Sequence, residues 1–157
     1  RSVEALDTAL RRRFSFKEMT PEYALLEGIT SDGIELSDLL RTINNRIEGL
    51  LDKDHVIGHS YFLRVANGET TLVDVFFNEI IPLLQEYFYG NFGRIELVLG
   101  KGFVKSSTVS QSIFAKPSPD NDEFNDHLRY SLVCREEMDE AAFQKALRVL
   151  MNKSDEA

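Results

Sequence analysis

Three consecutive arginines close a predicted N-terminal helix and are the first residues whose type and spacing suggest chemistry. Apolar residues from Val3 to Phe14 recur three and four positions apart, so they share one face of a helix. On this helix Arg12 lies opposite the apolar face, and Arg11 and Arg13 flank it. Cations at a helix C-terminus ordinarily stabilise the helix dipole, but three side chains so spread cannot all cover the last turn. At least one guanidinium is therefore offered outward, where it suits bidentate contacts with phosphate oxygens.

A second candidate is the run Gly58, His59, Ser60 and Tyr61, at the predicted start of a short helix over residues 61–66. Free amides and the helix dipole make a glycine-led polar turn of this kind favourable for an anion. An ordinary helix start, with Ser60 as the cap and aromatic residues entering the core, explains the same residues. The spacing alone favours this ordinary explanation.

Two histidines raise the question of a metal. His55 and His59 stand four residues apart beside Asp52 and Asp54, a spacing that would chelate zinc on one continuous helix. Gly58 and the polar break before it interrupt such a helix, and no third strong ligand is evident. We therefore expect no metal site.

The lone cysteine, Cys134, excludes an internal disulfide and fits a reducing compartment, so we expect a cytoplasmic protein. We expect its side chain to be a small buried or half-buried one rather than a nucleophile. Glu79 and Glu86 are isolated carboxylates, which we expect to be solvated or paired.

Composition limits the class of partner. The 157 residues include 18 Lys and Arg against 26 Asp and Glu, a formal net charge of −8, so the chain is a poor candidate for direct binding to nucleic acid. No apolar run approaches the roughly 20 residues that span a bilayer, so we expect no membrane contact. The sequence contains no Gly-x-x-x-x-Gly-Lys-Ser/Thr phosphate loop, so alone it has no evident place for a triphosphate and its magnesium. The length suits one domain or one and a half, and the first residue, Arg1, suggests a piece of a longer chain.

Hydrophobic periodicity predicts mainly helices. The strongest pattern covers residues 35–51 and puts polar residues such as Asn44 on the side opposite the apolar face. A second long helix is predicted from Thr71 to Tyr89, kinked or split near Glu79 because Pro82 lies within it. A final helix is predicted over residues 136–151, before a frayed tail.

Short extended segments and loops complete the prediction. Residues 14–19 alternate apolar and polar side chains, which is typical of a short strand. Residues 28–34 and 105–127 have the composition of loops, and within or after the second loop residues 112–115 and 130–133 are predicted to pair as strands. Residues 96–100 fit either a helix end or a short strand.

Three stretches of the chain resemble one known family. Residues 1–16 are similar to the stretch that follows sensor 1 in McrB-type AAA+ proteins, the GTP-hydrolysing motor subunits of 5-methylcytosine-specific restriction systems. Residues 57–62 resemble the sensor 2 region of the family's helical lid, and residues 78–88 resemble the lid helix that follows. The three stretches occur in the family's order and with similar spacing, and the resemblance covers roughly residues 1–100.

This resemblance implies a mainly α fold with a few short strands: the last helix and strand of an AAA+ α/β core, then its helical lid. Residues 1–20 would end the core, residues 21–100 would form the lid, and residues 101–157 would be an extension with a two-stranded piece and a C-terminal helix. Arg13 or Arg12, with Arg11 third, would be an arginine finger that reaches a neighbouring subunit's nucleotide. Gly58, His59, Ser60 and Tyr61 would lie near the subunit's own nucleotide. Many AAA+ lids place an arginine at sensor 2, where this sequence offers His59, Tyr61 and, further on, Arg64.

The resemblance also implies partners for the intact parent. It would bind GTP or ATP with Mg²⁺, form a homo-oligomeric ring, expected to be a hexamer, and drive a nuclease subunit, with DNA contacted through other domains. The chain alone would bind no cofactor and would be inactive. One alternative is the lid of a MoxR-like or dynein-like AAA+ ATPase unrelated to restriction. Another is a stand-alone helical interaction module, whose partner groove would be the apolar face around Phe76, Phe77, Ile80 and Ile81.

Overall fold

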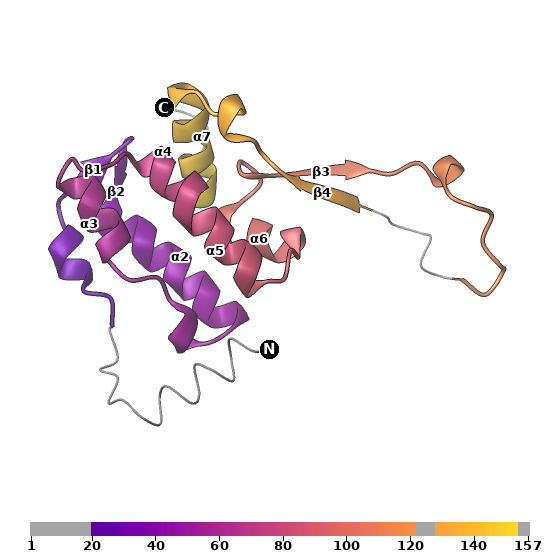
Figure 1. The fold of residues 1–157 in the computed structure, drawn as a ribbon, viewed down its shortest axis with the longest axis horizontal. Helices are drawn as coiled ribbons and strands as arrows, with labels where there is room; N and C mark the ends of the chain where they lie inside the picture. The colour runs from indigo at the N-terminus through magenta and orange to yellow at the C-terminus, as the bar shows by residue number, and fades with distance from the viewer. Residues whose placement is uncertain (1–19, 122–127, 154–157) are drawn as a thin grey trace.

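The computed structural model describes residues 20–121 and 128–153 of the chain. Over these ranges helices dominate and strands are short, which confirms the predicted mainly α fold (Figure 1). The predicted helix over residues 3–14, the strand over residues 14–19 and the three arginines Arg11, Arg12 and Arg13 lie outside the described residues. The elements, in chain order, are a 3₁₀ turn η1 (Tyr23–Leu26), β1 (Thr30–Ser31), β2 (Ile34–Glu35), α2 (Leu36–Leu50), η2 (Lys53–His55), α3 (Ser60–Ala66), α4 (Leu72–Val75), a π-helical turn η3 (Phe76–Ile80), α5 (Ile81–Tyr87), α6 (Phe92–Leu99), β3 (Val104–Thr108), η4 (Gln111–Ile113), β4 (Leu128–Leu132), η6 (Arg135–Glu137) and α7 (Glu140–Leu150).

The central helix α2 forms where the sequence predicts it. Its apolar face is buried because Leu36, Leu40 and Ile47 recur at helical spacing. The prediction is wrong for Asn44, which is only 2% exposed and lies among the buried residues of the helix rather than on its polar side.

The segment before α2 contains more structure than the predicted loop over residues 28–34. Strands β1 and β2 form a small antiparallel hairpin with Ser31 opposite Ile34. The two residues between them, Asp32 and Gly33, have φ values of 53° and 78°. A two-residue hairpin loop requires such left-handed conformations, which glycine adopts without strain.

The second long helix is interrupted, as predicted, where Pro82 follows Glu79. It consists of α4, then the π-helical turn η3, then α5, in which the proline occupies the first turn. Because proline has no main-chain N–H to donate, the first turn is where a helix tolerates it. The N-terminus of α4 is capped by Thr71, whose Oγ1 accepts a hydrogen bond from the amide of Asp74 at 3.3 Å.

The core has an aromatic cluster at its centre, and Phe76 is its hub. The Phe76 ring lies 5.2 Å from that of Phe103 and 5.6 Å from that of Phe143, measured between ring centroids, and stacks at 6.4 Å on Phe62. These rings come from η3, the segment before β3, α7 and α3, so the C-terminal region shares one core with the preceding helices. Phe76, Ile80 and Ile81 are buried and Phe77 is partly buried against the same core, so in the part of the chain that the structure describes this face is not the exposed groove that a stand-alone interaction module would need.

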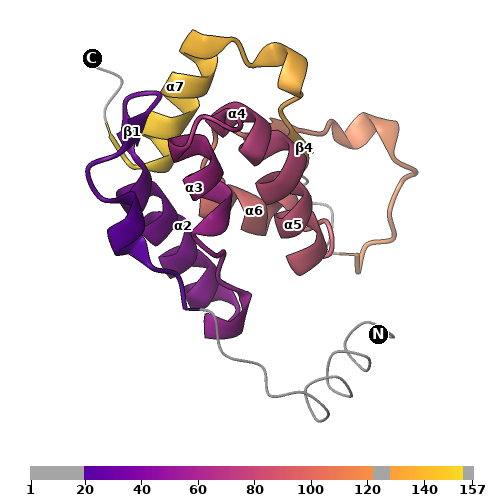
Figure 2. The same ribbon diagram turned by 60° about the vertical axis from the view of Figure 1, so that its left-hand side comes forward.

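Residues 96–100 complete α6 and are thus a helix end. After them, β3 and β4 pair antiparallel with Val104 opposite Leu132 and Thr108 opposite Leu128. The predicted pairing of residues 112–115 with 130–133 is therefore wrong, as is the loop predicted to begin at residue 105. The two strands form a narrow ribbon that stands away from the helical body (Figure 1), and in Figure 2 the segment beyond β3 that contains η4 projects from the helices.

The last helix, α7, is shorter than the predicted range 136–151, because the 3₁₀ turn η6 occupies the first residues of that range. Asp139 caps the helix: its side chain accepts a hydrogen bond from the amide of Ala142 at 2.7 Å. It packs tightly on the chain before β3. A Cβ placed on Gly102 would lie 2.7 Å from the Cα of Ala146, so only glycine allows this approach.

Candidate functional site

The turn over residues 57–61 lies between η2 and α3. Ile57 is 1% exposed and anchors the turn, and Gly58, His59, Ser60 and Tyr61 follow it. Helix α3 begins at Ser60, and the cap position is held by His59, whose side chain makes no capping hydrogen bond. The predicted capping role of Ser60 is thus wrong, because Ser60 is already the first helical residue.

The imidazole of His59 contacts residues 22–23, which precede α2 and which we call the entry segment. Its Nδ1 lies 3.0 Å from the main-chain nitrogen of Glu22 and accepts a hydrogen bond from that amide. An imidazole nitrogen that accepts a hydrogen bond carries no proton, so the neutral ring has its proton on Nε2. His59 therefore offers a single N–H donor, from the edge of the ring opposite Glu22.

Asn44 of α2 fixes the main chain just before this turn. Its Nδ2 donates to the carbonyl of Ile57 at 2.9 Å, and its Oδ1 accepts from the amide of the same residue at 2.7 Å. Nδ2 also lies 3.1 Å from the hydroxyl oxygen of Tyr23 and donates to it. The buried amide thus has satisfied partners on both atoms, as a buried polar side chain requires.

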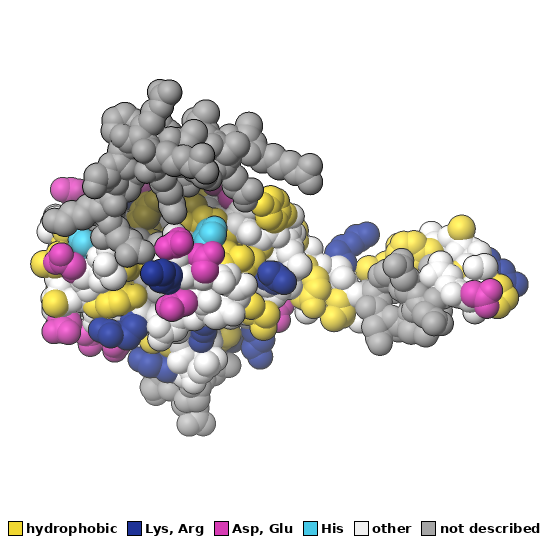
Figure 3. Space-filling model, turned by 90° about the horizontal axis from the view of Figure 1, so that it is seen from below, with side chains coloured by type: hydrophobic (Ala, Val, Ile, Leu, Met, Phe, Trp, Pro, Cys, Tyr) yellow, Lys and Arg dark blue, Asp and Glu magenta, His cyan; other side chains and the backbone are white. Residues whose placement is uncertain are grey.

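Tyr23 joins the entry segment to α2 a second time, because the guanidinium of Arg41 lies 4.5 Å from the centroid of its ring. A cation over an aromatic face at this distance is attractive, by about 0.5–1 kcal/mol at an exposed site. Residues 22–23, α2 and the turn at 57–59 are therefore held together by one polar network. The face of the molecule seen in Figure 3 carries histidine side chains among acidic and basic ones.

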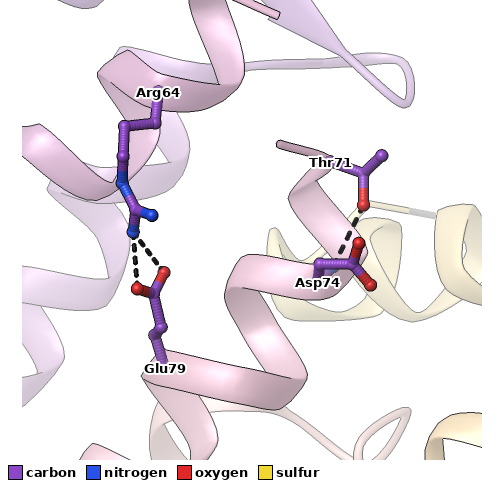
Figure 4. Close-up of polar contacts among 4 residues, drawn as sticks. All are labelled: Arg64, Thr71, Asp74 and Glu79. Atoms are coloured by element: carbon purple, nitrogen blue, oxygen red, sulfur yellow. Dashed lines mark hydrogen bonds and ion pairs between the residues drawn. The ribbon is translucent and has the colours of Figure 1, made fainter. Parts of the chain in front are cut away.

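Arg64, the arginine nearest to this turn in sequence, is paired with Glu79 (Figure 4). Its Nη2 lies 2.6 and 2.5 Å from the two carboxylate oxygens, and this hydrogen bonding raises the pKa of Arg64. The guanidinium also lies 5.9 Å from the ring centroid of Tyr61. This pair confirms the expectation that Glu79 is either solvated or paired. A shallow hollow of about 430 Å³ lies beside the pair, lined by Tyr61, Glu79, Pro82, Leu83 and Glu86.

The two histidines considered for zinc have different partners. His55 Nδ1 lies 2.6 Å from Oδ1 of Asp52, a contact that lowers the pKa of this carboxyl, and its ring meets Tyr87 edge to face at 5.0 Å. In residues 20–121 and 128–153, no group of three or more His, Cys, Asp or Glu side chains is placed to hold a metal.

Cys134 is exposed, which corrects the expectation of a buried or half-buried side chain. It precedes η6, in the short connection from the ribbon to α7, where few side chains cover it.

Sequence reasoning missed three residues of the polar network: Glu22, Tyr23 and Asn44. Asn44 carried a usable signal, since it lies four residues after Leu40 and three before Ile47, on the buried stripe of its helix. A polar residue at such a position predicts buried hydrogen bonds. The amide of Glu22 carried no signal, because any residue except proline supplies the same main-chain donor.

The fold and this network define a small helical domain in which residues 22–23 are fixed to the turn before α3. Residues 35–96 match the family model described as McrB, alpha-helical lid domain. This part of the chain is therefore a lid of the McrB type, an AAA+ class found in restriction systems. The match includes residues 57–62 and 78–88 and confirms their resemblance to the lid, whereas residues 1–16 lie outside it. A search of curated proteins returns no match to the chain. None of the helices in the described ranges is long and apolar enough to cross a membrane.

Proposed function

We propose that this chain closes over the nucleotide of a McrB-type AAA+ NTPase, with the turn at residues 58–61 facing the nucleotide of its own subunit. The observation that carries the proposal is the McrB lid match over residues 35–96, which spans this turn. His59 supplies one N–H donor there, directed by its hydrogen bond to the entry segment. The cradle for the phosphates and Mg²⁺ belongs to another part of the parent, because the chain contains no phosphate loop.

Arg64 is the second donor near the turn, but Glu79 pairs with it. Direct phosphate contact by Arg64 would require it to leave this carboxylate. We therefore assign the first contact to His59 and expect Glu79→Gln, which weakens the pair, to increase nucleotide affinity rather than reduce it.

In the intact protein, affinity for a non-hydrolysable GTP or ATP analogue with Mg²⁺ tests this assignment. His59→Ala should weaken binding at least about tenfold, since a hydrogen bond to a charged group contributes about 1.5–3 kcal/mol. His55→Ala is the matched control, because it removes an imidazole four residues away in sequence that contacts Asp52 instead. Equal affinities for wild type and His59→Ala would refute the assignment, and comparing the two analogues identifies the nucleotide.

The arginine finger is a separate part of the proposal. Arg13, with Arg12 next and Arg11 third, would act in trans on the neighbouring subunit's nucleotide in a homo-oligomeric ring. Fingers of this type contribute about 10³–10⁵ in rate to NTPases. The resemblance of residues 1–16 to the family supports this assignment.

Mixing two inactive variants tests action in trans. Subunits with Arg13→Ala keep their nucleotide site, and subunits with a disabled phosphate loop keep their arginine. If the finger acts in trans, mixed rings regain hydrolysis at the interfaces that combine the two intact parts. Arg94→Ala, at an exposed arginine of α6, is the control. Mixed rings that remain inactive, or an Arg13→Ala variant with full activity, would contradict the proposal. The isolated chain should not hydrolyse GTP or ATP.

The nuclease subunit and the DNA belong to the same proposal. A McrB-type parent would use nucleotide hydrolysis in its ring to drive a nuclease partner, and it would contact DNA through other domains. The acidic charge of this chain supports the second point. Direct DNA binding by the isolated chain at physiological salt would contradict it.

A further inference from the structure

We infer that Asn44 is a positioning residue for the nucleotide-facing turn: it holds both main-chain groups of Ile57 and thereby sets the orientation and tautomer of His59. The functional part of this inference rests on the proposed role of His59. The structural part stands on the hydrogen bonds alone.

The first step is the chemistry of the side chain. A carboxamide presents a donor and an acceptor side by side, so Asn44 pairs with Ile57 as a neighbouring strand would, at 2.9 and 2.7 Å. A carboxylate of the same shape accepts from the Ile57 amide but has no hydrogen for the Ile57 carbonyl. Because Asn44 is 2% exposed, water does not replace the missing donor at low cost.

The second step is that the network closes on itself. The other hydrogen of the Asn44 amide goes to the hydroxyl of Tyr23 at 3.1 Å. Tyr23 follows Glu22, whose amide donates to Nδ1 of His59, and His59 lies two residues after Ile57. Asn44 therefore holds both sides of the Glu22–His59 contact, the entry segment through Tyr23 and the turn through Ile57.

The third step is the consequence for the imidazole. A half-buried histidine with no fixed partner exchanges between two tautomers and several ring orientations, whereas a main-chain N–H directed at Nδ1 selects the Nε2–H form. If either the Glu22 amide or the turn that carries His59 is displaced, the hydrogen bond that selects the Nε2–H tautomer is lost. Asn44 thus determines which edge of the ring carries the donor, although it does not itself contact His59.

Asn44→Asp tests the inference, with Asn45→Asp as the matched control on the exposed side of the same helix. Ring ¹⁵N shifts of His59, measured by NMR in the 157-residue chain at alkaline pH, report the tautomer. We expect the Nε2–H form in wild type and Asn45→Asp, and a mixture of both forms in Asn44→Asp. A merely structural role would lower the melting temperature and leave the tautomer unchanged, which would overturn the inference.

Nucleotide binding by the intact protein separates the two proposals. Affinity for a non-hydrolysable GTP or ATP analogue with Mg²⁺ should fall about tenfold in Asn44→Asp, as in His59→Ala, and less than twofold in Asn45→Asp. A changed tautomer with unchanged affinity in both His59→Ala and Asn44→Asp would support the positioning of the ring and refute its role toward the nucleotide. If Asn44→Asp does not fold, the wild-type spectrum decides, because a His59 ring protonated on Nδ1 would overturn the inference.

Discussion

Replacement of Phe143 by alanine should destabilise the lid as a whole, although Phe143 lies outside residues 35–96. The side chain is 2% exposed and meets two other rings edge to face, Phe76 at 5.6 Å and Phe103 at 6.1 Å. Truncation of a buried phenylalanine costs about 3–5 kcal/mol, through lost burial and the cavity that remains. Each edge-to-face pair contributes about 0.5–1.5 kcal/mol of this beyond the buried area, so the two pairs place the expected loss in the upper part of that range.

Urea denaturation followed by far-UV circular dichroism measures this loss, since the chain has no tryptophan to report by fluorescence. We expect one transition at a lower urea midpoint, with an unchanged slope. Phe114→Ala is the control with the same change of side chain, at a position beyond β3 that is 42% exposed, and it should cost less than about 1 kcal/mol. Two separate transitions in wild type, or a loss below about 1 kcal/mol for Phe143→Ala, would refute the conclusion that the C-terminal region and the matched lid share one core.

Three smaller predictions follow. Gly102→Ala should cost about 1–3 kcal/mol of stability, and Ala146→Gly should not rescue it because the clash is with a main-chain Cα; thermal melts of single and double variants check this. The Ser37 hydroxyl lowers the pKa of Glu35, so this contact stabilises the fold above the ordinary carboxyl pKa and is lost as the pH falls through the lowered value. Ser37→Ala should move the NMR titration of Glu35 toward higher pH; an unmoved titration would contradict the assignment. Arg46→Met should cost about 1–2 kcal/mol in urea denaturation, because Arg46 donates to the last turn of α6 at 2.8 Å.

The helices of this domain could be predicted because their signal is local. In α2 and in the α4–α5 helix, apolar residues recur at helical spacing, and Pro82 marks the interruption by its own chemistry. In the π-helical turn, Phe76 packs against rings from three other segments, and no local pattern encodes such packing.

The strands could not be predicted in the same way. Strand β3 reads Val104-Lys-Ser-Ser-Thr108, with one buried residue and no alternation, because both faces of the ribbon meet solvent beyond its base. Its register is set by pairing with residues that lie between Leu128 and Leu132, more than ten residues beyond the end of the strand. Sequence patterns specify register strongly only where one face is buried. The apolar pair of segments chosen from the sequence was therefore the wrong one.

The candidate site was predicted in part for a related reason. The turn at residues 58–61 has a family-like sequence and lies within the matched lid, so its place in the lid could be predicted. The hydrogen bonds that hold this turn come from Asn44 and from the main-chain amide of Glu22. Both partners are distant in sequence, so a local sequence pattern does not reveal them.

The narrow ribbon of β3 and β4 has a practical consequence for anyone who wishes to crystallise this domain. Thr108 faces Leu128 at the last pair of the ladder, so an Asn-Gly dipeptide joining these two residues would close it as a tight hairpin. The shortened protein would dispense with residues 109–127 and retain each aromatic ring of the cluster around Phe76. It would be a smaller specimen with the same melting behaviour, and thus a convenient starting material for structural work on the lid.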